Sequence, residues 1–121
     1  MKLCQLDPPR SFSVGSINIK HSANIELDVN EQVTFVTASG TEYDVVRKSW
    51  GYYATPSING RLIDHGLYAV LVRNASGKIY LLLVEEQSKV EFDLYLEQEG
   101  LVIISWLTDF ATEIKDSQGT T

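Results

Sequence analysis

Cysteine and histidine are scarce in this chain, which narrows the chemistry that it can carry. A single cysteine, Cys4, excludes an intramolecular disulfide and a cysteine-based metal site. The two histidines, His21 and His65, stand far apart in the sequence, and neither belongs to a closely spaced ligand pair. We therefore expect no bound metal.

Long apolar runs are also missing. The longest one, Leu67–Val72, is only six residues long, whereas a helix needs about 20 to cross a bilayer. A charge at Asp7 interrupts the first residues before the core of a signal peptide can form. Together with the single cysteine, these absences predict a cytoplasmic protein that makes no contact with a membrane.

Motifs for catalysis and cofactor binding are absent as well. The sequence has no Gly-x-Ser-x-Gly elbow and no glycine-rich phosphate loop before a helix, so we expect no cofactor. Whether the protein is an enzyme stays open, because tyrosine, histidine and aspartate can act on sugars without any motif. The best set of this kind combines Asp64 and His65 with Tyr52 or Tyr53.

Basic residues are fewer than acidic ones and are unevenly spread. The net charge of −6 argues against nucleic acid as a partner, because phosphate binding needs a clustered basic stripe. Residues 45–84 hold five basic residues against Asp64 alone, and the rest of the chain holds five basic and fifteen acidic ones. This asymmetry either steers an anionic ligand toward the middle of the chain or forms a solvated face of mixed sign.

The length of the chain predicts a single domain over residues 1–121. Because each proline fixes its own φ and restricts the residue before it, Pro8 and Pro9 make residues 1–10 an extended lead-in. At the other end, a short helix could follow Thr108, and residues 117–121 are expected to fray.

Strand and turn patterns are what the sequence has in abundance. The predicted strands are 16–20, 24–29, 32–37, 42–47, 67–72, 78–84 and 101–107. The runs 67–72 and 78–84 are apolar throughout and are joined by the turn signal 74–77, so we expect them to form a central, buried hairpin. The last strand, 101–107, is also expected to be buried.

Residues 85–99 fit either a strand or a helix. Val90, Phe92, Leu94 and Leu96 alternate as in a strand, but Ser88 and Glu91 have the spacing of a capping box. Gly100 stands where a helix would end in the left-handed region, and we therefore predict a helix. The expected fold is α+β: a mainly antiparallel sheet, which could be rolled or barrel-like, with one late α-helix.

The segment Ser49–Leu62 concentrates aromatic, turn-forming and cationic residues. Its tryptophan and tyrosines offer flat faces with polar edges, and its arginine offers a planar donor fork. These groups suit a sugar-like or anionic ligand, or else they fill the core and a subunit interface. The candidate ligand-binding residues are Trp50, Tyr52, Tyr53, Asn59, Arg61, Asp64 and His65.

The pattern WGxYATPSxNGRL over residues 50–62 resembles the centre of a family of small uncharacterised bacterial proteins. The resemblance extends over most of the chain, from about Ile25 to Leu107. Members of that family are often encoded among genes for surface polysaccharides and sugar nucleotides, so the resemblance implies a ligand related to sugars. It implies no activity and no catalytic residue.

These observations favour a non-enzymatic binding or accessory protein in bacterial surface-glycan metabolism, which acts on a sugar-like ligand or on a partner enzyme. A small metal-free sugar isomerase or epimerase is the alternative, and an oligomeric structural or interaction subunit is a third possibility. We also expect a homodimer, because a small sheet with an open edge leaves backbone groups unpaired.

Overall fold

The computed structural model describes residues 1–108 of the chain, and the predicted helix after Thr108 and frayed tail at 117–121 lie outside this range. By its internal contacts the chain divides into two compact units. Unit 1 combines Met1–Val33 with Val45–Ala54, and unit 2 combines Thr34–Asp44 with the chain from Thr55 onward. Each unit is described by itself.

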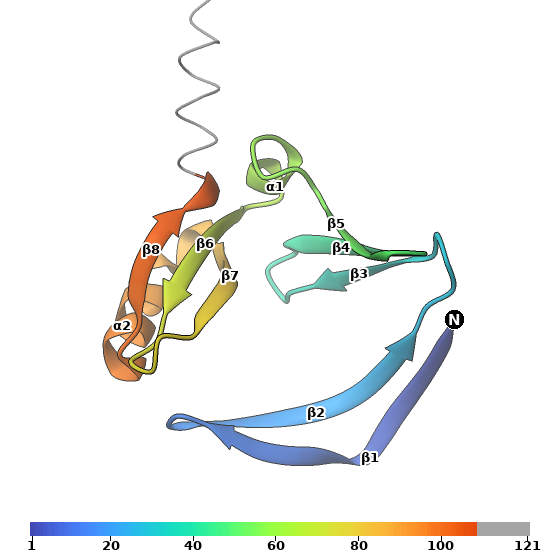
Figure 1. Ribbon diagram of the computed structural model, residues 1–121, viewed down its shortest axis with the longest axis horizontal. Coiled ribbons are helices and arrows are strands. Elements are labelled where there is room, and N and C mark those ends of the chain that lie inside the picture. Colours follow the sequence, from blue (N-terminus) through green and yellow to red (C-terminus); the bar gives the residue numbers. More distant parts are fainter. Residues whose placement is uncertain (109–121) are drawn as a thin grey trace, which may run out of the picture. The chain divides into compact units, whose positions relative to one another are not determined.

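Eight strands and three helices make up the described chain (Figure 1). The strands are β1 (Lys2–Val14), β2 (Ile17–Glu26), β3 (Gln32–Val36), β4 (Glu42–Lys48), β5 (Gly51–Thr55), β6 (Leu67–Arg73), β7 (Ile79–Glu85) and β8 (Val102–Trp106). The helices are α1 (Arg61–Asp64), the 3₁₀ turn η1 (Glu86–Ser88) and α2 (Lys89–Glu99). Mostly antiparallel sheet with one substantial late helix confirms the predicted α+β class.

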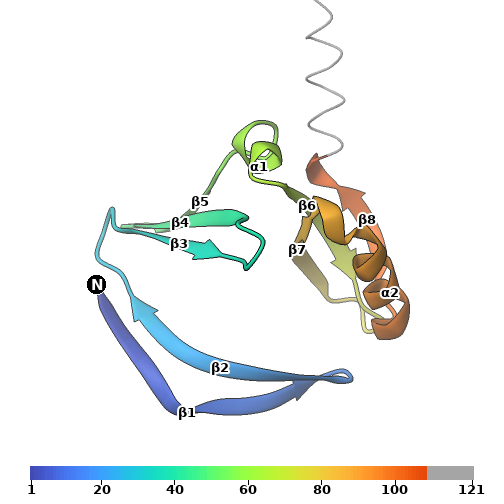
Figure 2. The ribbon, with the colours of Figure 1, turned by 180° about the vertical axis from the view of Figure 1, so that it is seen from behind.

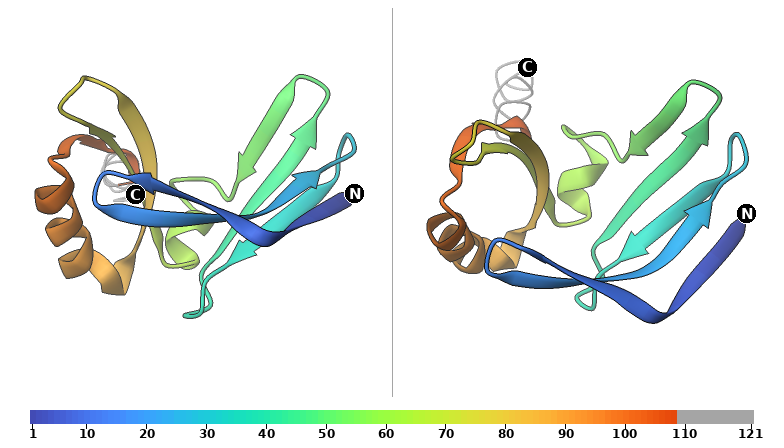
Figure 3. Two further views of the ribbon diagram at one scale, coloured as in Figure 1. Left: turned by 90° about the horizontal axis from the view of Figure 1, so that it is seen from below. Right: turned by 60° about the horizontal axis from the view of Figure 1, so that its bottom comes forward.

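Within these residues the strands form three small sheets, ordered β1-β2, β3-β4-β5 and β7-β6-β8. The first sheet is a long two-stranded ribbon that twists along its length (Figure 3). Its register shifts between Gln5 and Arg10, where Pro8 and Pro9 cannot donate to the ladder. The expected lead-in thus belongs to a paired strand, and the two predicted strands 16–20 and 24–29 are largely joined in one strand, β2.

Polar contacts hold the start of the chain to the loop after β2 in unit 1. The terminal ammonium of Met1 lies 3.1 Å from a carboxylate oxygen of Glu31, and Lys48 Nζ donates to Asn30 Oδ1 at 2.9 Å. The pKa of Glu31 is lowered, chiefly because its carboxylate accepts the backbone N–H of Asp28. Unit 1 therefore rests on strand pairing and polar contacts, because every buried apolar side chain of the described residues belongs to unit 2.

The sheet β7-β6-β8 of unit 2 carries the main core. Helix α2 packs on one of its faces (Figure 2), where the buried side chains of Val70, Val72, Val84 and Phe92 meet. The ring of Phe92 stands edge-on to that of Trp106, with centroids 5.7 Å apart. Apolar side chains of the three strands and of one face of α2 thus pack together in a single layer.

A second apolar cluster lies around helix α1. Leu62, Leu67 and Ala69 are buried there, and Tyr43, Leu83 and Leu107 pack against them. The hydroxyl of Thr108, which is fully buried, accepts the backbone N–H of Ala69 at 2.7 Å. Burial raises the pKa of the Tyr43 hydroxyl above its ordinary value of 10.0. The sequence pattern did not predict α1, because its four residues are too few to show a period.

The central hairpin is present, but its burial was overestimated. β6 is the middle strand and is buried along most of its length, as predicted. β7 and β8 are edge strands, and the side chains of Ile79, Leu81, Val102 and Ile104 are exposed. An apolar run shows that a segment can be buried on both faces, but it cannot show which strand of a sheet is central.

Helix α2 begins and ends close to the predicted positions. Gly100 adopts a φ of +64°, and its backbone N–H bonds to the last turn of the helix. The predicted capping box is wrong in its detail, because Ser88 makes no side-chain capping bond. Instead, η1 leads directly into the first turn, so the helix starts from a preceding 3₁₀ turn. In residues 1–108 no helix is both long and apolar enough to span a bilayer.

Gly100→Ala is expected to lower the free energy of unfolding by about 1 kcal/mol, because an alanine is strained in the left-handed region. No atom lies within 4 Å of the Cβ that the change would add, so no clash contributes. Urea denaturation measures the loss, and Gly100→Asn is the matched control, expected to lose less because asparagine tolerates this conformation. An alanine variant as stable as the wild type would contradict the assignment.

Candidate functional site

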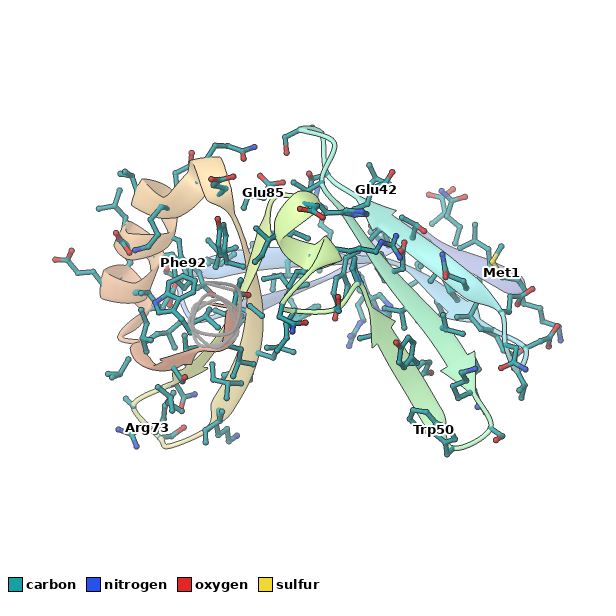
Figure 4. The ribbon with its side chains drawn as sticks, turned by 90° about the horizontal axis from the view of Figure 1, so that it is seen from above. Met1, Glu42, Trp50, Arg73, Glu85 and Phe92 are labelled. Atoms are coloured by element: carbon teal, nitrogen blue, oxygen red, sulfur yellow. The ribbon has the colours of Figure 1, made fainter. Side chains whose placement is uncertain are left out.

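The aromatic members of the predicted site belong to unit 1. Trp50 lies in the turn between β4 and β5 (Figure 4), and Tyr52 and Tyr53 follow on β5. Their side chains are exposed, by 71% for Trp50, 67% for Tyr52 and 51% for Tyr53. Trp50 and these tyrosines therefore do not fill a core of the single chain, and their place at a subunit interface or in a ligand site stays a prediction.

The remaining predicted residues, Asn59, Arg61, Asp64 and His65, belong to unit 2. Arg61 Nη2 lies 4.0 Å from Oδ2 of Asp44, whose other oxygen accepts the hydroxyl of Thr34 at 2.6 Å. Asp44 is buried and Arg61 is mostly exposed. Arg61 thus faces a carboxylate of its own chain, as a structural arginine would.

Asp64 and His65 line an open cleft of about 400 Å³. The opposite side is formed by the β3–β4 turn, Ser39–Glu42, and His65 Nδ1 lies 3.4 Å from the backbone oxygen of Glu42. The sequence-based grouping of Asp64 with His65 thus has a counterpart in space. The cleft is wide open, and it is lined by polar side chains and by the glycines Gly40 and Gly66.

Glu85, at the end of β7, ties this turn to the sheet of unit 2 (Figure 4). Its Oε1 accepts the hydroxyls of Thr37, Ser39 and Thr41 at 2.5–2.7 Å. The pKa of Glu85 is lowered, with the bond from Thr37 as the largest cause, followed by those from Thr41 and Ser39. Three donors hold the carboxylate ionised, so Glu85 is an anchor and not a proton donor.

Gly66, just before β6, contacts the same β3–β4 turn. Its φ is +79°, and an added Cβ would meet Thr41 Cγ2 at 3.4 Å. Its backbone oxygen accepts the N–H of Glu86 at 2.9 Å, which continues the β6–β7 ladder by one pair. Glycine suits this position because of its positive φ, which L side chains rarely adopt.

A second hollow, of about 320 Å³, lies on the α2 face of the sheet, where β7 passes into α2. Its wall carries the rings of Tyr68 on β6 and Trp106 on β8, both half-buried. The other lining residues are Val84, Glu85, Glu86 and Lys89. This volume is at the small end of the range for ligand pockets, and aromatic walls with a few polar groups are typical of such pockets.

Lys89 is the one cationic residue among the described residues that line this aromatic pocket. Its Nζ lies 5.5 Å from the centre of the Trp106 ring and bonds to Asp93 Oδ1 at 2.8 Å. The lining holds two carboxylates, Glu85 and Glu86, against this one ammonium. Because the ammonium is already paired, the pocket disfavours an anion and suits a neutral ligand with hydroxyl groups.

Tyr68 and Trp106 were not among the residues predicted from the sequence. A signal existed for Tyr68, because it lies two residues from the buried Val70 on the same strand and so shares its face. Register then decides the rest: Val70 pairs with Trp106, which brings the two rings to neighbouring strands. Pairing between strands so far apart in the chain is not visible in a local pattern.

Comparisons with known proteins add no assignment. No protein family, no curated protein and no solved structure matches the sequence. The resemblance of residues 50–62 to a bacterial family therefore stays a prediction. Within residues 1–108, no group of three or more His, Cys, Asp or Glu side chains is placed to hold a metal ion.

Glu85→Gln is expected to make stability less sensitive to acid. A carboxylate with a lowered pKa stabilises the fold above its ordinary value of 4.5, and this contribution is lost as the pH falls through the lower folded value. The wild type should therefore be more stable near neutral pH, and the difference should shrink below about pH 4. Thermal unfolding across pH measures this. Glu86→Gln, which removes the same charge next to the cluster, should show a smaller change, and equal profiles for both variants would contradict the anchor.

Arg61→Lys is expected to change the free energy of unfolding by less than about 1 kcal/mol, because the Arg61–Asp44 pair is largely exposed on the arginine side. Asp44→Ala should cost about 1 kcal/mol or more, since the buried carboxylate also accepts the Thr34 hydroxyl. Urea denaturation of both variants compares the two losses. A larger loss for the Arg61 variant would show that the ion pair is the main brace.

Proposed function

We propose that the protein is a non-enzymatic binding protein whose ligand is a neutral, sugar-like molecule held in the aromatic pocket of unit 2. The single observation that carries this proposal is that Tyr68 and Trp106, on the neighbouring strands β6 and β8, line one hollow together with charged residues. The apolar faces of a sugar ring suit aromatic side chains, and its hydroxyls suit carboxylate and ammonium groups.

The polar rim favours neutral ligands over sugar phosphates and nucleotides. Glu86 is exposed and free to accept hydroxyl groups at the mouth of the pocket, and Lys89 can donate to an oxygen beside the Trp106 ring. A phosphate would face Glu85 and Glu86 in place of a basic cluster. The uneven charge along the chain, which allowed an anionic ligand, is thus outweighed by the local charges of this pocket.

A binding role is preferred to catalysis because Glu85, an acidic residue that lines the pocket, is held in its ionised form. Glu85 is held ionised by three hydroxyls, so it does not supply a proton to a ligand near neutral pH. The residues of the isomerase alternative belong to different units, with Tyr52 and Tyr53 in unit 1 and Asp64 and His65 in unit 2. No observation favours their joint action.

The wider role in the proposal follows the resemblance of residues 50–62. That resemblance implies bacterial surface-glycan metabolism, in which a cytoplasmic accessory protein would present or retain a sugar for a partner enzyme. The aromatic pocket is an independent ground for the same class of ligand, because it rests on Tyr68 and Trp106 and not on the resembling segment.

The proposal can be tested with Trp106 as reporter. In a Trp50→Phe variant Trp106 is the only tryptophan, so its fluorescence reports the pocket alone. Titration with neutral monosaccharides, short neutral oligosaccharides and a uridine diphosphate sugar is expected to give a saturable change with a neutral sugar. The nucleotide should bind more weakly because of the acidic lining.

Two variants locate the ligand. Tyr68→Leu removes one ring face and is expected to weaken binding about tenfold. Lys89→Gln is expected to weaken binding as well, and because this side chain is exposed, the change leaves the core intact. Tyr52→Leu is the matched control in the segment predicted from the sequence. Binding that is lost in Tyr52→Leu but kept in Tyr68→Leu would move the site to that segment, and the absence of binding by every probe would overturn the proposal.

A further inference from the structure

Strand β7 is an edge strand without the usual protection against pairing. It pairs with β6 in an unbroken register from Ile79 to Glu85 and has no proline and no charge between these ends. The other edge, β8, has a register shift against β6, which disturbs its outer side. Long, regular, apolar edges readily accept another strand. Of the two edges, β7 is therefore the one open to a partner.

The hydrogen bonds at the two ends of the β6–β7 ladder show which groups face outward. Asn74 N–H bonds to the oxygen of Lys78, and Glu86 N–H bonds to the oxygen of Gly66. In an antiparallel pair the bonded residues alternate, so the even-numbered residues of β7 bond to β6. The backbone groups of Ile79, Leu81, Leu83 and Glu85 thus point to the open edge, where the described sheet has no further strand.

We propose that this edge pairs with β7 of a second copy of the chain, antiparallel, with the two-fold axis at Leu82. This register sets Ile79 opposite Glu85 and Leu81 opposite Leu83. Among symmetric antiparallel registers, it is the one that pairs all four outward-facing residues with one another. The two sheets become one continuous sheet across the axis.

Charge complementarity supports the second copy as the occupant. The same register sets Lys78 of one copy opposite Glu86 of the other, just beyond each end of β7. Opposite charges across a strand pair stabilise it, and the symmetry makes this pair occur twice. Shifting the axis to Leu81 or Leu83 would lose both ion pairs and would leave one of the four outward residues without a partner.

A groove beside the edge is shaped for the side chains that this pairing brings. It has a volume of about 490 Å³ and lies between β7 and α2. The strand contributes Leu82 and Val84 to it, and the helix contributes Phe92 and Tyr95. Tyr80 of the second copy stands opposite Val84 and on the α2 face, so its ring enters this groove. This accounts for a tyrosine that is 46% exposed in the single chain.

Charge reversal tests the register. Light scattering across low to high micromolar concentrations should show a dimer for the wild type. Lys78→Glu and Glu86→Lys should each weaken dimerisation about tenfold, and the double variant should restore it because the opposed charges are only exchanged. Lys20→Glu, an exposed reversal in unit 1, is the control and should leave the dimer unchanged.

Cross-linking tests the axis independently of charge. In a Cys4→Ser background, Leu82→Cys faces itself across the axis and should form an intermolecular disulfide on mild oxidation. Leu81→Cys, which faces Leu83 of the second copy, should cross-link far more slowly. A wild type that is monomeric at high micromolar concentration, a double reversal that fails to restore the dimer, or equal cross-linking at both positions would overturn the proposal.

Discussion

The carboxylate of Glu85 is the contact on which the described arrangement of unit 2 depends. It stands at the end of β7 and collects three hydroxyls from the β3–β4 turn, a segment more than forty residues earlier in the chain. Because hydrogen bonds to an ionised acceptor are stronger than neutral ones, three of them hold a turn that has little apolar surface of its own. Thr41, one of the three donors, also lies beside Gly66.

The end of β7 serves more than one role because three structural transitions meet there. The strand passes into η1 and then α2, the ladder to β6 ends at Gly66, and the β3–β4 turn is tied to Glu85. Where a sheet ends under a helix, side chains cannot fill every space, and the aromatic pocket and the groove beside β7 both lie there. The proposed ligand and the proposed second copy thus use neighbouring hollows on the α2 side of the sheet. Val84 and Glu85 of β7 line both of them.

Periodicity identified most elements, because it reports burial within a single segment. The strands 32–37, 42–47 and 67–72 and the helix ending at Gly100 were predicted close to their observed positions. Local patterns were less successful where burial depends on neighbours, as at the exposed ends of β7 and β8. The grouping of Asp64 with His65 was predictable because the two are adjacent in sequence, whereas Tyr68 and Trp106 meet only through strand register.

By itself the sequence determined the α+β class, the helix stop at Gly100 and the lack of a cysteine-based metal site, since each follows from residue type and local spacing. Tertiary structure decided which apolar strand is central, which carboxylate collects the hydroxyls and which aromatic rings share a pocket. Those outcomes depend on contacts between segments that are distant in the chain. A local sequence pattern does not determine which distant segments pair or in which register.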